Sequence, residues 1–405
     1  MSLNIIIIND FAHVNGGASQ VALSSAMALA KHDHTVTFFS AVGPITPELS
    51  SHSNLKVFCT NQYEILKDPN RLRAIAQGIW NFKAARSISE ILNLCDPQKT
   101  IVHIHAWTKA LSSSVISKTL KLGFKVVLTL HDYFIACPNG GFFNYPQNKV
   151  CRLHPMSLKC MIANCDSRNF LHKLWRVTRK LIQIKLGSIP EGIKHFIVIS
   201  DFSRAVLEPY LPNNAVIHCI DNPIDVPKKE PVKIHENTAL VAVGRLSKEK
   251  GSRLLAETSY RLGTKAIFVG DGEDRDLIFR FNPNAEITGW VSHEEVIAYL
   301  GKARALVFPS LLFETQGLAV CEAAAMGVPA IVPDTCAAKE MVINGVSGLW
   351  FEGGNGDDLA DKMTILQDRN IAQRMGLAAY TRHWSNPMTM DNHINQLEKV
   401  YNQIL

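Results

Sequence analysis

The fold class is indicated by residues 305–327, which read ALVFPSLLFETQGLAVCEAAAMG. Residues 305–310 form a short apolar run typical of a buried strand, and the small residues of 317–326 predict a closely packed helix. Glu314 is therefore expected on the strand-to-helix loop and Glu322 inside the helix. Because ligands of open parallel sheets bind where the strands end, both acids are candidate ligand-binding residues.

The start of this helix, at Gly317 and Leu318, is expected to favour phosphate, because its first N–H groups have no partner inside the helix. A carboxylate beside phosphate is repelled, so Glu314 and Glu322 are expected to meet neutral hydroxyl groups, such as those of a sugar and a ribose. The alternative is that both are ordinary solvated acids. The flanking strand and helix favour the ligand-binding interpretation.

The same alternation of apolar runs and helical stretches extends along the 405 residues, a length that predicts two domains. Most apolar runs are continuous in Val, Ile, Leu or Phe, as expected for parallel strands covered on both faces. We therefore predict an α/β protein of two doubly wound, Rossmann-like domains facing across a cleft. Residues 223–237 contain three prolines and three lysines and predict the linker.

The predicted parts are an N-terminal domain at 1–222 with an insertion at 137–165, the linker, a C-terminal domain at 238–385, and a helix within 386–405. Packing of this last helix against the N-terminal domain is left open. After Pro333 the strand pattern ends, and 357–367 and 388–404 are expected to be helical.

Composition is that of a globular protein, with 47% hydrophobic and 19% charged residues. No apolar run reaches the length of about 18 residues that a membrane-spanning helix needs. The opening run 4–9 has no basic leader and predicts a strand instead of a signal peptide. We therefore expect a cytoplasmic protein whose nine cysteines are mostly reduced.

Two loops carry residues suited to phosphate. Gly16 and Gly17 follow the first predicted strand, where glycine allows close approach of the backbone, although a plain strand-to-helix turn is an equal alternative. Arg245 and Lys250 follow the first strand of the second domain, and a guanidinium beside an ammonium suits a diphosphate. The alternative there is a solvated basic loop. Neither loop matches a dinucleotide or Walker A motif.

Histidines end two apolar strands of the first domain. His131 ends the run 125–131 and is placed to face a ligand, although a lone histidine is more often satisfied locally. His103 and His105 lie on a neighbouring strand, and we interpret them as structural.

Taken together, these motifs resemble glycosyltransferase family 4, whose members are retaining enzymes of the GT-B fold. The motifs that occur in the family's order are Gly16-Gly17, His131-Asp132, residues 222–225, Gly244-Arg245 with Lys250-Gly251, and Glu314 with Gly317 and Glu322. The resemblance covers nearly the whole chain. The sequence departs from the family pattern at Thr315-Gln316, beside the expected donor-sugar contact, and in a four-cysteine insertion after His131.

The resemblance implies roles for the matched residues. Arg245 and Lys250 match the pair that neutralises the donor diphosphate, and Glu322 matches the acid that holds the ribose hydroxyls. The glycine pair matches the loop that meets the diphosphate when the cleft closes. The implied donor-binding residues are Gly16, Gly17, Arg245, Lys250, Gly317, Leu318 and Glu322. The implied catalytic candidates are His131, beside the reaction centre, and Glu314, which faces the transferred sugar.

The implied function is transfer of a sugar, with retention, from a UDP- or GDP-sugar to a glycan or lipid-linked glycan. The implied setting is assembly of a surface polysaccharide such as lipopolysaccharide, capsule or exopolysaccharide. Domain 1–222 would bind the acceptor and domain 238–385 the nucleotide sugar. No cofactor or catalytic metal is expected, because Arg245, Lys250 and a helix start can stabilise the departing diphosphate. The alternatives are an epimerase-like enzyme of the same form and a non-catalytic nucleotide-sugar-binding protein; nucleic acid is not an expected partner.

The insertion holds four cysteines within 29 residues: Cys137, Cys151, Cys160 and Cys165. Their spacing is not that of paired C-x-x-C motifs. Structural zinc, reduced thiols and disulfides all remain open as interpretations.

Residues 168–185 predict an amphipathic helix with six Lys or Arg and no acid. The expected apolar stripe is Leu171, Leu174, Trp175, Thr178, Leu181 and Ile182. The bordering cations are Lys173, Arg176, Arg179, Lys180 and Lys185. One interpretation is peripheral association with the inner face of the cell membrane, near a lipid-linked acceptor. The equal alternative is a helix that turns its apolar stripe to the core and its basic face to solvent.

Overall fold

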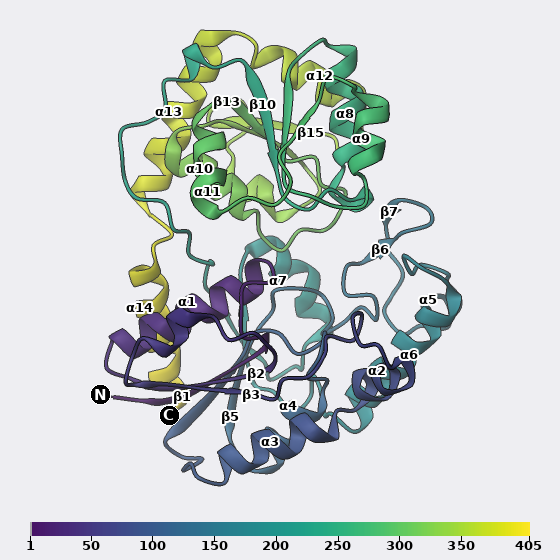
Figure 1. Ribbon diagram of the computed structural model, residues 1–405, viewed down its shortest axis with the longest axis vertical. Helices are drawn as coiled ribbons and strands as arrows, with labels where there is room; N and C mark the ends of the chain where they lie inside the picture. The colour runs from purple at the N-terminus through teal and green to yellow at the C-terminus, as the bar shows by residue number, and fades with distance from the viewer. Residues whose placement is uncertain (1) are drawn as a thin grey trace. The chain divides into compact units, whose positions relative to one another are not determined.

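Two parallel sheets built from apolar strands form the cores of two units in the computed structural model, which describes residues 2–405 (Figure 1). The first unit comprises the residues up to Gly141, Arg152–Pro223 and Thr389–Leu405. The second comprises Phe142–Cys151 and Ile224–Met388. Helices lie on both faces of each sheet, which confirms the predicted pair of doubly wound, Rossmann-like domains.

The sheet of the first unit has the order β3-β2-β1-β4-β5-β8-β9, and all its strands run parallel. Its strands are β1 (Asn4–Phe11), β2 (Thr35–Val42), β3 (Leu55–Cys59), β4 (Thr100–Ile104), β5 (Lys125–Thr129), β8 (His195–Val198) and β9 (Val216–Cys219). Isoleucines 5–8 are at most 2% exposed, so both faces of β1 are covered. This is why the run is continuously apolar and not alternating.

The helices of the first unit connect these strands and cover the sheet. They are α1 (Gly17–Lys31), α2 (Arg71–Ile79), α3 (Phe82–Leu92), α4 (Ser114–Lys121), α5 (Leu158–Ile162), α6 (Phe170–Lys185), α7 (Asp201–Leu207) and α14 (Met390–Ile404). The last helix packs against α1, and Ile394, Leu397 and Tyr401 complete the core there.

The sheet of the second unit has the order β12-β11-β10-β13-β14-β15, again all parallel. Its strands are β10 (Ala239–Val243), β11 (Ala266–Val269), β12 (Glu286–Ile287), β13 (Ala303–Val307), β14 (Ala330–Pro333) and β15 (Gly348–Phe351). Its helices are α8 (Ser252–Arg261), α9 (Arg275–Phe281), α10 (His293–Gly301), α11 (Leu318–Met326), α12 (Gly356–Ile365) and α13 (Arg369–Ser385). A separate antiparallel hairpin of β6 (Phe143–Asn144) and β7 (Lys149–Val150) also belongs to this unit.

Short 3₁₀ turns complete the chain: η1 (Pro47–Ser50), η2 (Glu208–Tyr210), η3 (Ile234–Glu236), η4 (Lys248–Lys250) and η5 (Ala337–Met341).

The sequence prediction was wrong after Pro333, because β15 extends the sheet of the second unit beyond β14. Only three of its four residues are apolar, and glycine-containing turns flank them, so no apolar run marks this strand. Helix α13 was also not predicted. Within residues 2–405, no helix is both long and apolar enough to cross a membrane.

Candidate functional site

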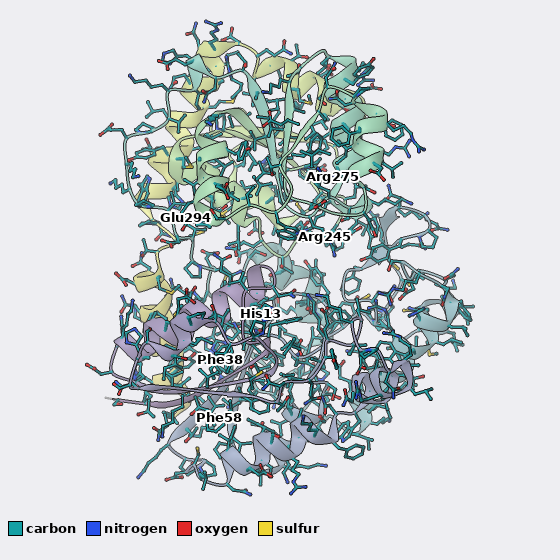
Figure 2. The ribbon with its side chains drawn as sticks, viewed as in Figure 1. His13, Phe38, Phe58, Arg245, Arg275 and Glu294 are labelled. Atoms are coloured by element: carbon teal, nitrogen blue, oxygen red, sulfur yellow. The ribbon has the colours of Figure 1, made fainter. Side chains whose placement is uncertain are left out.

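In the second unit, the predicted donor-binding residues lie on loops at the carboxyl ends of β10 and β13. Gly244 and Arg245 follow β10, and Lys250 ends η4 in the same loop. Ser310 lies just beyond β13, and all four residues line one small cavity of about 50 Å³. Figure 2 shows Arg245 projecting from the loop. Parallel strands bring these loops to one edge of the sheet, as the sequence pattern indicated.

The two cations of this site are each held by a carboxylate. A guanidinium nitrogen of Arg245 lies 2.6 Å from Oε1 of Glu249, whose side chain is only 5% exposed. Nζ of Lys250 lies 2.6 Å from Oε1 of Glu314, which also accepts a 2.5 Å hydrogen bond from Oγ of Ser310. The sequence analysis assigned Lys250 to the diphosphate and Glu314 to the transferred sugar. It did not predict their direct contact.

The loops meet backbone to backbone at Gly251. This glycine has φ of 72°, and a Cβ there would lie 2.0 Å from the carbonyl oxygen of Pro309. A side chain is excluded both by the left-handed dihedral and by this approach. The close contact is what brings Lys250, the preceding residue, within reach of Glu314.

Helix α11 begins beside this pair. Its N-cap Gly317 provides no side-chain hydrogen bond, and its first turn, from Leu318, contains no acid. The first N–H groups are therefore suited to an anion.

Glu322 lies farther along α11 and is 9% exposed. Burial raises the pKa of this carboxyl, and His293 opposes the rise. Nδ1 of His293 lies 3.8 Å from Oε1 of Glu322, while its Nε2 lies 3.0 Å from the carbonyl oxygen of Asp225. His293 was not predicted as a site residue, because it belongs to another helix and only the fold brings it to Glu322.

The glycine pair of the first unit opens α1. Gly16 is the N-cap with φ of 89°, and Gly17 is the first helical residue. A Cβ at Gly16 would meet nothing within 4 Å, so the dihedral, and not a lack of space, favours glycine. The loop belongs to a different unit from Arg245 and Lys250.

His131 follows β5, and its Nε2 lies 3.0 Å from Nδ1 of His105, which follows β4. Burial lowers the pKa of His131 to about 3 and holds that of His105 well below its usual range, so both rings are neutral at neutral pH. His105, interpreted above as structural, is thus a direct partner of His131. His103 instead contacts Tyr401 and Thr129, at 2.6 and 2.7 Å.

Asp10 is a further buried polar residue that the sequence analysis missed. Its carboxylate accepts hydrogen bonds of 2.8 to 2.9 Å from the backbone N–H groups of residues 109–111. It lies in β1, where the only signal was an acid within an apolar run. Its hydrogen bonds fix the loop after β4, on which His105 also lies.

The four cysteines of the insertion are not gathered around a common point. Among residues 2–405, no group of three or more His, Cys, Asp or Glu side chains could hold a metal ion, which gives no support to the zinc interpretation. Cys137, Cys160 and Cys165 are buried in the first unit, whereas Cys151 belongs to the second. One of these cysteines, Cys165, accepts a 3.1 Å hydrogen bond at Sγ from the side-chain amide of Asn139.

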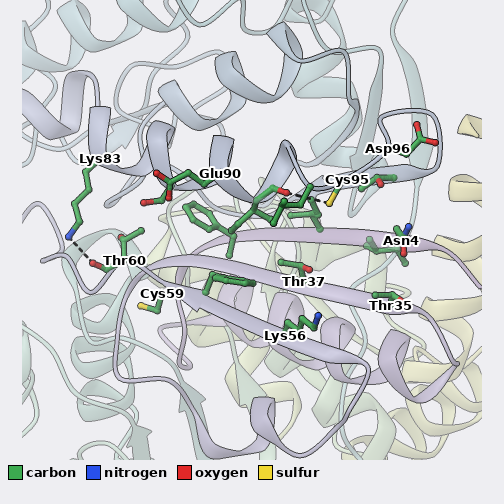
Figure 3. A pocket seen from close by; sticks show the side chains of 18 residues that line it. Asn4, Thr35, Thr37, Lys56, Cys59, Thr60, Lys83, Glu90, Cys95 and Asp96 are labelled. Carbon is green, nitrogen blue, oxygen red and sulfur yellow. Dashed lines mark hydrogen bonds between the residues drawn. The ribbon is translucent and has the colours of Figure 1, made fainter.

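A larger cavity of about 560 Å³ lies elsewhere in the first unit (Figure 3). It lies between α3 and one face of β1, β2 and β3, and its lining includes Thr37, Phe58 and Lys83. None of the predicted site residues lines it. The candidate site is therefore defined by the strand-end loops and not by cavity size.

Comparison with known proteins gives consistent matches over both units. Residues 15–228 match the family model described as Glycosyltransferase Family 4, and residues 237–368 match the one described as Glycosyl transferases group 1. Glycogen synthase of Mycobacterium tuberculosis is 26% identical over 303 residues, 68% of this chain and 70% of its own length.

Two further proteins are similar. The capsular polysaccharide biosynthesis glycosyltransferase CapM of Staphylococcus aureus is 26% identical over 185 residues, 42% of this chain and 48% of its own. The crystal structure of Anabaena HepE in complex with UDP-glucose superposes with a TM-score of 0.67 at 16% identity, covering 99% of this chain and 100% of that one.

Proposed function

The chain belongs to glycosyltransferase family 4 and is a glycosyltransferase of the GT-B fold, and we propose that it transfers a sugar, with retention, from a nucleoside-diphosphate sugar to a glycan or lipid-linked glycan. The observation that carries the proposal is the cavity lined by Arg245 and Lys250, beside the uncapped start of α11. Two cations and the start of a helix without a side-chain cap are suited to a diphosphate.

The pairing of Lys250 with Glu314 indicates how we expect the donor to bind. A diphosphate carries more negative charge than one carboxylate, so it competes with Glu314 for the ammonium. Once released, Glu314 is free to accept hydrogen bonds from hydroxyls of the transferred sugar. Glu322, one turn farther into α11, is proposed to hold the ribose hydroxyls.

In the proposed reaction, the bond from the sugar's anomeric carbon to the diphosphate breaks, and a bond to the acceptor oxygen forms on the same face. The acceptor proton passes to the leaving diphosphate oxygen. Arg245, Lys250 and α11 stabilise the charge that develops on that group. His131, neutral because its burial keeps its pKa low, is proposed to lie beside the transferred sugar as a hydrogen-bonding group.

We infer that UDP- or GDP-sugars are the donors and that the acceptor belongs to a surface polysaccharide. The UDP-glucose complex of a protein of the same fold supports the first inference, and similarity to a capsular glycosyltransferase supports the second. A cytoplasmic enzyme working at the inner face of the membrane would meet a lipid-linked acceptor there.

The proposal is tested by measuring nucleotide binding in a thermal-shift panel of UDP, GDP, ADP and their sugars, because a ligand that binds the native state raises its melting temperature. We expect Lys250→Met to weaken binding of the preferred diphosphate roughly 10- to 100-fold, the effect of losing a charge-assisted hydrogen bond. Lys265→Met is the matched control, since Lys265 also pairs with a glutamate, Glu286, in the same unit. Equal binding by the two variants would contradict the assignment.

Product analysis separates the remaining alternatives. With donor and a glycan acceptor, a transferase gives a new glycoside, and NMR shows whether the anomeric configuration of the donor is kept. An epimerase-like enzyme would convert donor without acceptor. A binding protein would show a thermal shift and no turnover.

A further inference from the structure

Helix α6 buries cationic side chains and exposes leucines, the reverse of an ordinary amphipathic helix. Leu171, Leu174, Leu181 and Leu186, just beyond the helix end, are 74, 43, 44 and 53% exposed. Lys173, Arg179 and Lys180 are at most 8% exposed. The alternative expected above, an apolar stripe against the core with a basic face in solvent, is therefore wrong.

The inversion arises because the buried cations have acceptors. Arg179 donates a 2.9 Å hydrogen bond to the carbonyl oxygen of Thr108 and lies over the ring of Phe134. Lys180 donates to the carbonyl oxygens of Phe134 and Ile135. Lys173 lies 3.8 Å from Sγ of Cys160. With these contacts on the inner face, the leucines of the opposite face are left outside.

Two neighbouring helices also carry exposed apolar residues. Helix α2 packs against α6, with the indole N–H of Trp175 donating to the carbonyl oxygen of Ile75 at 3.2 Å. On α2, Leu72 is 81% exposed, and on α5, which also contacts α6, Leu158 and Ile162 are 77 and 72% exposed. We call the exposed leucines of α6 and Leu186, together with the groove beside α2, the apolar face. Figure 1 shows the three helices gathered in one part of the first unit.

A groove within the apolar face is lined by both apolar and cationic groups. It has a volume of about 220 Å³, and Leu66 and Leu171 contribute to its apolar lining. Arg71, Arg168 and Arg176 line it as well. Arg176 is paired with Asp166, but within residues 2–405 no carboxylate lies within ion-pair distance of Arg168.

The charge of the surrounding chain is one-sided. Of the eight Lys or Arg in residues 152–185, Lys173, Arg179 and Lys180 are buried, and so is the single acid, Asp166, which leaves only cations among the exposed charges of this segment. Lys159 and Lys185 are exposed near the two ends of this surface. An apolar surface edged by cations is complementary to a bilayer, whose interior is apolar and whose headgroups can be anionic.

We propose that the apolar face binds the surface of an anionic lipid bilayer, with the leucines of α6 entering the headgroup region and Arg168 and its neighbours contacting phosphate groups. This inference names the residues that would make the membrane contact suggested above and the side of α6 that would face the membrane. It does not depend on the proposed donor chemistry. A second copy of the chain fits this surface less well, because a two-fold symmetric contact would place the cationic surface of one copy against that of the other.

The test is co-sedimentation of the full-length protein with phosphatidylcholine vesicles that contain or lack phosphatidylglycerol. We expect binding to the anionic vesicles, weakened by salt because the headgroup contacts are exposed. Free glycerol 3-phosphate should not compete, since it offers no apolar surface. Failure of the wild-type protein to bind anionic vesicles at low salt overturns the proposal.

Variants locate the contact. Leu171→Ser/Leu174→Ser should weaken partitioning about tenfold or more, from the apolar surface lost. The control is Leu94→Ser, because Leu94 is 89% exposed in the same unit and lies beyond α3, at the large cavity. Equal binding by the double variant and the control would refute the location.

Two further measurements complete the design. Analytical ultracentrifugation should find a monomer, and a dimer that the double variant dissociates would assign the apolar face to a second copy instead. Nucleotide binding by the double variant should equal that of the wild type. If the wild-type protein binds nucleotide but not vesicles, the membrane inference alone is contradicted. If neither the wild type nor the double variant binds any nucleotide, only the proposed function is contradicted.

Discussion

His131 takes part in a hydrogen bond that determines which of its nitrogens carries the proton. Nε2 of His105 is buried and has no hydrogen-bond partner among the described residues. A buried donor without a partner is rarer than a buried acceptor without one, which favours the proton on Nδ1 of His105. His131 then accepts at Nε2 and carries its own proton on Nδ1. His105 thus sets the tautomer of His131.

We predict that His105→Phe lowers kcat about tenfold with little change in donor affinity, because only the orientation and tautomer of His131 change. ¹⁵N NMR of the His131 ring should show loss of the single tautomer, which a purely structural role for His105 would not produce. His105→Gln, which keeps a hydrogen-bonding side chain, should restore part of the activity. The control is His195→Asn, because His195 belongs to another stacked pair, with His218. A wild-type tautomer in His105→Phe would contradict the role.

At the scale of elements, the donor-site geometry depends on two loops that touch through their backbones. The loop after β10 and the loop after β13 approach so closely at Gly251 and Pro309 that no side chain fits. The same approach places Lys250 against Glu314. The stability of this loop pair and the positions of the proposed phosphate-binding groups are therefore linked.

Gly251→Ala should destabilise the protein by about 3 kcal/mol, since it adds a steric conflict to an unfavourable dihedral. Gly263→Ala is the control, because Gly263 has φ of 60° but open space around its Cα. That change should cost about 1 kcal/mol. Denaturant unfolding measures both, and similar values would mean that the contact at Pro309 relaxes without cost. Nucleotide binding should weaken only in Gly251→Ala.

At the scale of the whole molecule, the first unit contains several buried neutral histidines. Burial lowers the pKa of His103 and His131 to about 3 and that of His393 to about 4. In the unfolded chain these groups return to about 6.5. Between those values these rings bind more protons in the unfolded chain than in the folded one, so the histidines contribute a loss of stability as the pH falls. The raised pKa values of the buried Asp10 and Asp132 in the same unit act in the opposite direction.

We expect the unfolding free energy of the first unit to decrease below pH 6.5 by up to about 1.4 kcal/mol per pH unit for each such histidine. Thermal unfolding followed from pH 7.5 to about pH 5 checks this. His393→Gln should reduce the slope, whereas His235→Gln, an exposed change in the second unit, should leave it unchanged. Equal slopes in the wild type and His393→Gln would contradict the contribution of this ring.

The strand-and-helix alternation, the doubly wound sheets, the positions of Arg245 and Glu314 beyond strand ends and that of Glu322 inside a helix were all predictable, because periodicity and strand polarity are local properties of the chain. The strand β15 was not, since only three apolar residues lie between its glycine-containing turns. The departure at Thr315-Gln316 could be seen in the sequence, but its consequence for a bound sugar could not.

Only the tertiary structure decided which groups meet. Lys250 and Glu314 are 64 residues apart, and His105 and His131 are 26 apart, so their contacts follow from strand order and loop packing. The polarity of α6 is the clearest case. Its sequence shows two faces, one apolar and one cationic, but a helix buries whichever face finds partners. Carbonyl oxygens of the loops near Thr108 and Phe134 bind the cations, so the leucines lie outside.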